Sequence, residues 1–433
     1  MICKNLSVNE ANHLTLGGVD VTLMAEKYGT PLYLFDEDRV RENCRTYLHA
    51  MREAFGEDAA PLYASKAAAF RALYRIMREE GMGIDVVSSG EVYTAVCADF
   101  PMAKAYFHSN NKTDADIAYA MDVGVGYFVV DNVEELDAIA REAARRGTRQ
   151  KVLLRLTPGI DPHTYAAVAT GKVDSKFGSA IETGQAEEIA VYAASLPSIE
   201  LCGFHCHVGS QVFDADVFLQ SSAIMLDFVA LMEKKHGFVT RELDLGGGFG
   251  VRYLDTDPYI DIPAVIREIA AAMKAHCKAL GIALPAVRME PGRSIVADAG
   301  MTLYTVGTVK RIPGYKNYVS VDGGMTDNPR FALYGSAYTV LPASRVENDA
   351  ARFTCSVVGR CCESGDILQE NVSLPADISR GELLAVLTTG AYNYSMASNY
   401  NRIPRPPVVM LSGGRDTLAV RRERPEDVAQ YDI

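Results

Sequence analysis

The sequence contains no CxxC pair, no long block of lysines and arginines, and no evident apolar run near the ~18 residues that cross a bilayer. Its nine cysteines are an odd number, and Cys361 and Cys362 are adjacent. Neither a disulfide framework nor a standard zinc knuckle is therefore expected. The first residues also lack the basic and apolar regions of a secretory signal. These absences favour a cytoplasmic protein with reduced thiols.

The charge balance argues against nucleic acid as a partner. The chain has 43 Lys+Arg against 55 Asp+Glu, a formal net charge of −12. Proteins that bind nucleic acid cluster cations to neutralise phosphates. The 433 residues, 48% of them hydrophobic, are enough for a large core and for two or three domains.

Eight short apolar or β-branched runs lie between residues 60 and 293, and we predict that each forms a strand. They are PLYASK (61–66), GIDVVSS (83–89), AYFHSN (105–110), GYFVVDN (126–132), KVLLRLTPG (151–159), IELCGFHCH (199–207), ELDLGGG (242–248) and AVRMEPG (286–292).

Stretches with helical spacing separate these runs. VEELDAIAREAARRG and IPAVIREIAAAMKAHCKALG repeat apolar residues at helical intervals and end in basic residues and glycine, as many helices do. Eight alternations of strand and helix favour a (β/α)8 TIM-like barrel over an open sheet.

After about residue 295 the sequence pattern changes to short β-rich runs broken by glycine and proline. These runs predict a C-terminal antiparallel β domain that also takes in the N-terminal strand PLYLFD (31–36). We therefore expect a barrel over residues 37–293 and a β domain built from residues 1–36 and 294–433.

Polar residues that follow barrel strands are the candidates for chemistry, because barrel active sites lie at the carboxyl ends of the strands. Lys66 ends the first run beside three alanines, where partial desolvation would lower the pKa of its amine and permit imine chemistry. Glu290, next to Arg293, is either half of a plain ion pair or a carboxylate that faces a protonated ring nitrogen, leaving the arginine for an anion.

Two further strand ends have both a structural and a functional interpretation. Gly246, Gly247 and Gly248 could form a tight turn, or could bring backbone N–H groups to a phosphate. Strand alternation places His205 and His207 on one face, where they could pack or stack on a planar ligand. The cysteines of the same strand fall on the other face, which disfavours a metal site, so no metal is expected.

Seven motifs resemble the pyridoxal-phosphate decarboxylases built on an alanine-racemase-like barrel. The motifs follow one another in the same order as in that family, from about residue 60 to 405. They are YASKA, HCHVGSQ, DLGGGFG, MEPGR, MTDNPRFALYG, CCESGD and GAYNYSMASNYN.

The resemblance implies that pyridoxal 5'-phosphate is the cofactor. It implies that Lys66 carries the cofactor as an imine, that His207 stacks on its ring and that Glu290 pairs with its ring nitrogen. It further implies that Cys362 is the acid that returns a proton to Cα, acting across the interface of a homodimer with shared active sites. The residues implied at or beside the phosphate are Ser210, Gly246, Gly247, Gly248, Gly292, Arg293 and Tyr392.

The implied substrate is meso-2,6-diaminopimelate, decarboxylated at its D centre to L-lysine and CO2. Its far end carries an ammonium and a carboxylate, so its pocket needs an anion and a cation together. Glu363 is the candidate for the ammonium. The candidates for the carboxylate and its surroundings are Arg293, Arg330, Tyr334 and Tyr392.

Two alternatives remain open from the sequence. One is a decarboxylase of another basic amino acid or of carboxynorspermidine, although such substrates have no distal carboxylate that Arg330 could bind. The other is a non-catalytic homologue that only binds the cofactor, which the presence of Lys66, Cys362 and Glu363 together disfavours.

Overall fold

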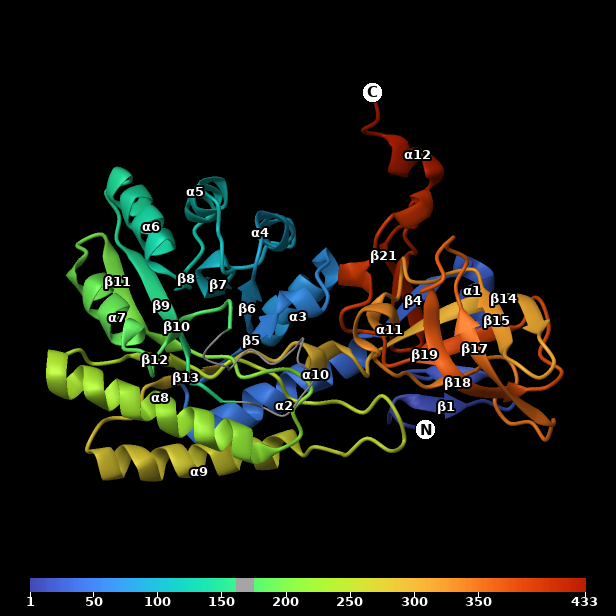
Figure 1. Cartoon of the computed structure of the whole chain (residues 1–433), viewed down its shortest axis with the longest axis horizontal. Helices are drawn as coiled ribbons and strands as arrows, with labels where there is room; N and C mark the ends of the chain where they lie inside the picture. Colours follow the sequence, from blue (N-terminus) through green and yellow to red (C-terminus); the bar gives the residue numbers. More distant parts are fainter. Residues whose placement is uncertain (161–174) are drawn as a thin grey trace. The chain divides into compact units, whose positions relative to one another are not determined.

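The computed structural model describes residues 1–160 and 175–433 (Figure 1). The chain divides into two compact units. The barrel unit contains residues 44–250 and 259–292, and the β unit contains residues 1–43, 251–258 and 293–433. The domain extents expected from the sequence, with a barrel over 37–293, stay a prediction.

The barrel unit contains the eight expected parallel strands. They are β5 (Ala60–Ala64), β6 (Gly83–Val86), β7 (Ala105–Phe107), β8 (Tyr127–Val130), β9 (Gln150–Thr157), β11 (Ile199–His205), β12 (Glu242–Asp244) and β13 (Ala286–Met289). The order β9-β11-β12-β13-β5-β6-β7-β8 closes on itself because β8 also pairs with β9. The short strand β10 (Ser179–Ala180) pairs with β9 outside the ring. The predicted TIM-like barrel is therefore confirmed.

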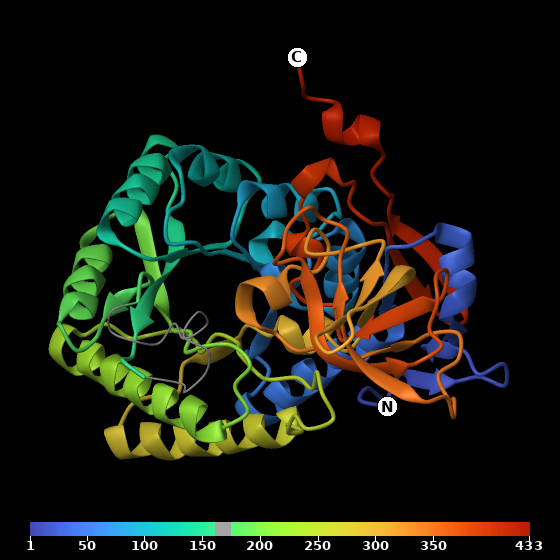
Figure 2. The same cartoon turned by 45° about the vertical axis from the view of Figure 1, so that its right-hand side comes forward.

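Helices surround this ring of strands (Figure 2). They are α3 (Arg71–Glu80), α4 (Ser89–Val96), α5 (Asp114–Asp122), α6 (Val133–Arg145), α7 (Gln185–Ser195), α8 (Ala215–His236) and α9 (Ile262–Leu280), and α2 (Glu37–Phe55) precedes them in the chain. Side-chain caps start several of them: Asn132 accepts from the Glu135 amide at α6, and Asp261 accepts from the Ala264 amide at α9. Gly281, in the left-handed conformation, ends α9 as the sequence predicted.

Helix α8 is apolar enough by length and composition to cross a membrane, with a mean hydropathy of 1.5 over its most apolar window. The sequence analysis had found no such run. Since 56% of that window is buried and α8 packs against α9, the helix has the features of a core helix, which is apolar on the side that it buries.

The β unit contains a three-stranded sheet, a larger sheet and short helices. The small sheet consists of β1 (Leu6–Val8), β2 (Leu14–Leu16) and β3 (Val19–Asp20). The large sheet consists of β4 (Leu32–Asp36), β14 (Gly300–Arg311), β15 (Asn317–Val321), β16 (Val340–Pro342), β17 (Arg352–Val358), β18 (Ile367–Pro375), β19 (Leu383–Leu387), β20 (Val408–Ser412) and β21 (Arg415–Val420). The short helices are α1 (Val21–Tyr28), α10 (Arg293–Val296), α11 (Arg330–Tyr334) and α12 (Pro425–Ala429).

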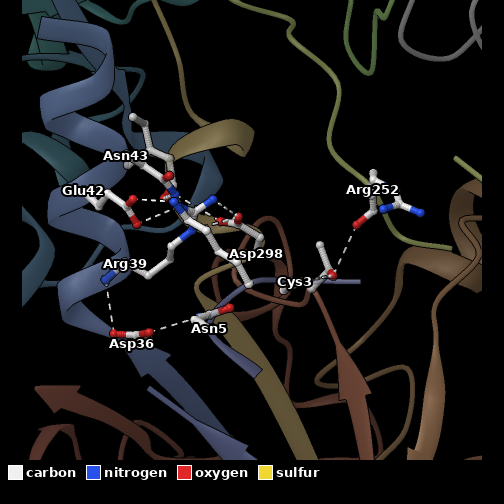
Figure 3. Close-up of polar contacts among 11 residues, drawn as sticks. Cys3, Asn5, Asp36, Arg39, Glu42, Asn43, Arg252 and Asp298 are labelled. Atoms are coloured by element: carbon white, nitrogen blue, oxygen red, sulfur yellow. Dashed lines mark hydrogen bonds and ion pairs between the residues drawn. The ribbon is translucent and has the colours of Figure 1, made fainter. Parts of the chain in front are cut away.

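The N-terminal strand joins this sheet as expected, since β4 lies between β14 and β20. Most pairs are antiparallel, as predicted, but β4 with β20 and β15 with β17 are parallel. Polar contacts anchor the segment that follows β4 (Figure 3). Arg39 Nε lies 3.0 Å from Asp298 Oδ2, and Asn43 Nδ2 donates to Asp298 Oδ1 at 3.0 Å.

Asp327 is a buried carboxyl group on which several parts of the β unit converge. Its side chain accepts from the Tyr304 hydroxyl and, at 2.9 Å, from the Gly324 amide, and its backbone oxygen accepts from the Tyr33 hydroxyl at 2.5 Å. Burial raises the pKa of Asp327 to about 7, against hydrogen bonds that lower it. The protonated form is therefore favoured in the folded state over an unusually wide pH range.

We predict that Asp327→Asn becomes more stable relative to wild type as the pH rises from about 4 to 8. A carboxyl group with a raised folded pKa ionises first in the unfolded chain, so its contribution to stability falls over that interval. We expect the difference in unfolding free energy to change in favour of the variant by roughly 1–3 kcal/mol. Urea unfolding of both proteins across this interval measures it, and a difference independent of pH would contradict the assignment.

Candidate active site

Three side chains from separate strand ends meet at the carboxyl side of the barrel. His108 follows β7, His205 ends β11 and Glu290 follows β13. Nε2 of His108 lies 2.7 Å from Glu290 Oε1, and Nε2 of His205 lies 3.1 Å from Glu290 Oε2. All three residues are buried. The sequence had placed polar residues at these strand ends but had not paired them.

The electrostatics single out Glu290 among three buried carboxyl groups. Burial raises the pKa of Asp85 to about 6, and burial together with Glu290 raises the pKa of Asp244 well above its usual range. Glu290 is different because the imidazoles of His108 and His205 outweigh burial and hold its pKa well below the ordinary value. Glu290 is therefore the one of these three carboxyl groups that stays ionised to the lowest pH.

Lys66 lies directly after β5, in the short 3-10 turn Ser65–Ala67. The sequence analysis expected a crowded and partly desolvated amine, but the Lys66 residue is exposed. Its small neighbours Ala67 and Ala68 are buried. The amine influences Asp85, Glu91 and His207 electrostatically, which places its charge at the same end of the barrel.

His207 is a neutral imidazole. Its Nδ1 accepts a hydrogen bond of 3.3 Å from the Gly247 amide, and burial lowers its pKa well below the usual value. A neutral ring held in this way can stack on a planar ligand without bringing a second positive charge beside it. Ser210, half-buried, lies three residues further on, in the turn after β11.

The glycine run after β12 is required by close packing of the protein backbone. A Cβ atom on Gly246 would lie 2.5 Å from the Cys206 carbonyl oxygen, one on Gly247 2.0 Å from that of Glu290, and one on Gly248 2.3 Å from that of Gly209. The Gly246 amide donates to Asp244 Oδ1. The run therefore shapes the loop, and the amides of Gly246 and Gly247 already have acceptors within the barrel.

Close packing also requires glycine at position 292, because a Cβ on Gly292 would lie 2.9 Å from the Cβ of Ala64. The end of the β13 segment thus lies against β5, the strand that leads to Lys66. Close contact between these two segments brings Glu290 and Lys66 to the same region of the barrel.

The β unit contains a separate cationic cluster. The guanidinium groups of Arg293 and Arg330 lie 4.8 Å and 5.1 Å from the centre of the Tyr392 ring. Arg293 donates to the Tyr253 hydroxyl at 2.6 Å, and Tyr334 lies 5.3 Å from the Arg330 guanidinium. Both arginines are buried. Arg330 forms no ion pair with a carboxylate in the described parts of the chain, and its Nε has no hydrogen-bond partner there.

Cys362 and Glu363 lie on an exposed loop between β17 and β18. Asp366, which is buried, holds this loop by accepting from the amides of Met325 at 2.6 Å and Cys361 at 2.7 Å. The Cys362 amide donates to Asn401 at 2.8 Å. The sequence analysis missed these supports, although both residues belong to motifs that it had quoted.

The barrel residues fit pyridoxal phosphate. Glu290 is a buried, ionised carboxylate that pairs with imidazoles and with no lysine or arginine among residues 1–160 and 175–433. A protonated ring nitrogen supplies the cation that such a group lacks. Lys66 provides an accessible amine at the same end of the barrel.

A lysine after a barrel strand, a buried carboxylate and a neutral imidazole are together compatible with a pyridoxal-phosphate enzyme. The family described as "Pyridoxal-dependent decarboxylase, pyridoxal binding domain" matches residues 38–297. The chain belongs to this family, and pyridoxal phosphate is its cofactor.

Within this family, the chain is similar over nearly its whole length to proteins named diaminopimelate decarboxylase. The chain is 43% identical over 425 residues to diaminopimelate decarboxylase of Bacillus subtilis, covering 98% of this chain and 96% of the relative. It is 40% identical over 415 residues to the Staphylococcus aureus enzyme of the same name, covering 96% of each. Diaminopimelate decarboxylase of M. jannaschii, solved with L-lysine, superposes with a TM-score of 0.91 at 31% identity, covering 100% of this chain and 98% of the other.

We predict that Gly247→Ala weakens cofactor binding by at least tenfold, because the new Cβ would force the loop away from the backbone of Glu290. Gly90→Ala is the control, since a Cβ there would meet only the Ser88 side chain at 3.7 Å. Equilibrium dialysis against pyridoxal phosphate measures both affinities. Equal affinities for the two variants would mean that the loop tolerates the displacement.

Proposed function

We propose that this protein decarboxylates meso-2,6-diaminopimelate at its D centre and releases L-lysine and CO2. The observation that carries the proposal is Arg330, a buried cation without a carboxylate partner among the described residues. A distal substrate carboxylate would supply that partner. Full-length relatives named diaminopimelate decarboxylase support the same substrate.

The proposed cofactor contacts begin with Lys66, whose amine would carry pyridoxal phosphate. His207 would stack on the ring, and Glu290 would face its nitrogen. The residues proposed at or beside the phosphate are Ser210, Gly246, Gly247, Gly248, Gly292, Arg293 and Tyr392. For Gly246 and Gly247 the contribution would be the shape of the loop, because their amides donate to Asp244 and His207.

Bound pyridoxal phosphate supplies an electron sink for the pair left at Cα when CO2 departs. Glu290 contributes a fixed negative charge that keeps a proton on the ring nitrogen. Cys362 is proposed to deliver the proton that Cα then needs, from its thiol. The hydrogen bond from its amide to Asn401 and the anchoring of the loop by Asp366 would orient that thiol.

Recognition of the far end of the substrate needs charges of both signs. Arg330 is proposed to bind the distal carboxylate, with Tyr334, Arg293 and Tyr392 around it. Glu363, which is exposed and accepts from the Gly365 amide at 3.1 Å, is proposed to receive the distal ammonium. A substrate that lacks either charge would leave one of these groups without a partner.

We further propose a cytoplasmic homodimer in which each active site combines Lys66 of one subunit with Cys362 of the other. Support comes from the exposure of Cys362 and Glu363 on their loop, which leaves both side chains accessible to a second chain. The small-molecule substrate is an amino acid, as in relatives solved with L-lysine.

The substrate is tested by assaying CO2 and amine products from meso-diaminopimelate and from amino acids without a distal carboxylate, for wild type, Arg330→Met and Arg330→Lys. We expect L-lysine from diaminopimelate with wild type. Arg330→Met should raise KM for diaminopimelate roughly 10- to 150-fold, since it loses a charge-assisted bond of about 1.5–3 kcal/mol. Exposed Arg415→Met is the matched control and should resemble wild type.

Activity on substrates without the distal carboxylate should change little in Arg330→Met. An equal loss of kcat/KM on both substrate types would show that Arg330 is structural. Absence of L-lysine from diaminopimelate in cofactor-loaded wild type would refute the proposed activity itself.

The shared site is tested by mixing inactive Lys66→Ala with inactive Cys362→Ala under verified subunit exchange. Half of the dimers would be mixed, and each would contain one intact site, so about a quarter of the wild-type activity should return. Activity that stays at zero would place both residues in the same subunit.

A further inference from the structure

His108 and His205 contact different oxygens of the same carboxylate. His108 reaches Oε1 of Glu290 and His205 reaches Oε2, at 2.7 Å and 3.1 Å. The two imidazole rings lie edge to face, with centres 4.8 Å apart and planes at 70°. Since the three residues come from three different strands, the barrel fixes the carboxylate from two directions.

Burial lowers the pKa of both imidazoles, while the Glu290 carboxylate raises it. A neutral imidazole that faces a carboxylate must present an N–H group, and in both rings the facing atom is Nε2. Nδ1 of His205 is buried without a hydrogen-bond partner, which a ring nitrogen without a proton tolerates better than an N–H group.

A metal ion is the alternative use of this cluster. The ligand atoms of His108, His205 and Glu290 lie within 4.8 Å of one another. Two trans ligands on one Zn2+ are at most about 4.2 Å apart, given bonds of about 2.1 Å. A metal would also need both Nε2 atoms without protons, which would turn the partnerless Nδ1 of His205 into a buried donor. Direct contact of both imidazoles with the carboxylate therefore explains the geometry better: His205 is hydrogen-bonded to Glu290, and His108 Nε2 lies 2.7 Å from its other oxygen without the alignment of a hydrogen bond.

We propose that His108 and His205 are positioning residues, His205 donating Nε2–H to one oxygen of Glu290 and His108 presenting Nε2 at 2.7 Å from the other, and that together they hold its plane and its charge ready for the cofactor ring nitrogen. The proposal rests on the role proposed for Glu290. The neighbouring carboxyl groups compete poorly for this role. Asp85 Oδ1 lies 3.9 Å from His108 Nε2, and Asp244 accepts from the Gly246 amide instead. The imidazole pair thus favours ionisation of Glu290 over that of its two neighbours.

The test compares His108→Gln with His108→Asn and His108→Leu. A glutamine amide can place an N–H group near the former Nε2 position, an asparagine amide is one carbon too short, and leucine has no donor. We expect the dissociation constant of pyridoxal phosphate to rise about 10- to 100-fold in His108→Leu and His108→Asn. His108→Gln should recover most of the wild-type affinity. Equilibrium dialysis without substrate gives these values.

The pH dependence of the visible absorbance of bound cofactor is the second measurement. It should shift in His108→Asn and return towards wild type in His108→Gln, which a mere packing defect would not produce. Circular dichroism identifies variants that do not fold, and the Gln and Asn pair remains decisive if His108→Leu is one of them. Equal affinities and equal pH profiles for Gln and Asn would overturn the proposal. Because no substrate is added, this result is independent of whether diaminopimelate is the substrate.

Discussion

A single ionised carboxylate, buried at the carboxyl end of the barrel, is the constraint on which the rest of the site depends. A buried charge is costly unless it has donors and a partner of opposite sign. Glu290 is hydrogen-bonded to His205 and lies 2.7 Å from His108 Nε2, and its remaining requirement is a cation. In the proposed site the cofactor would supply that cation through a protonated ring nitrogen.

The β unit contains the opposite case, a buried cation that needs an anionic partner. Arg330 lies against Tyr392 without a carboxylate partner in the described parts of the chain. The two requirements are of different kinds. In the proposed function Glu290 would serve the common chemistry of the cofactor, and Arg330 would serve the selection of one amino acid. This separation explains how relatives with one barrel chemistry could differ in substrate.

Regular features were predictable from the sequence because they depend on local pattern. The eight strands and the helices between them follow from apolar periodicity and from turn residues, and the first strand was correctly expected in the β domain. Contacts between side chains of different strands could not be predicted in this way. The pairing of His108 with Glu290 joins residues 182 positions apart, and it depends on the register of the closed barrel. Lys66 is more exposed than the crowded surroundings expected from its sequence neighbours.

The glycine run illustrates the same limit. Its motif suggested either a turn or a phosphate site, whereas the distances to the carbonyls of Cys206, Glu290 and Gly209 give a third reason for glycine. The composition of a loop indicates that something approaches closely. Only the arrangement of neighbouring strands identifies what approaches.

The central claim is that the carboxyl end of this barrel is a cofactor site built around Lys66 and Glu290. The most direct measurement is borohydride reduction of the protein loaded with pyridoxal phosphate, followed by peptide mapping. The account predicts a pyridoxyl group on Lys66, at about one per chain, and none on the buried Lys112, which is held by Glu135. A label on any other lysine, or none at all, would contradict it.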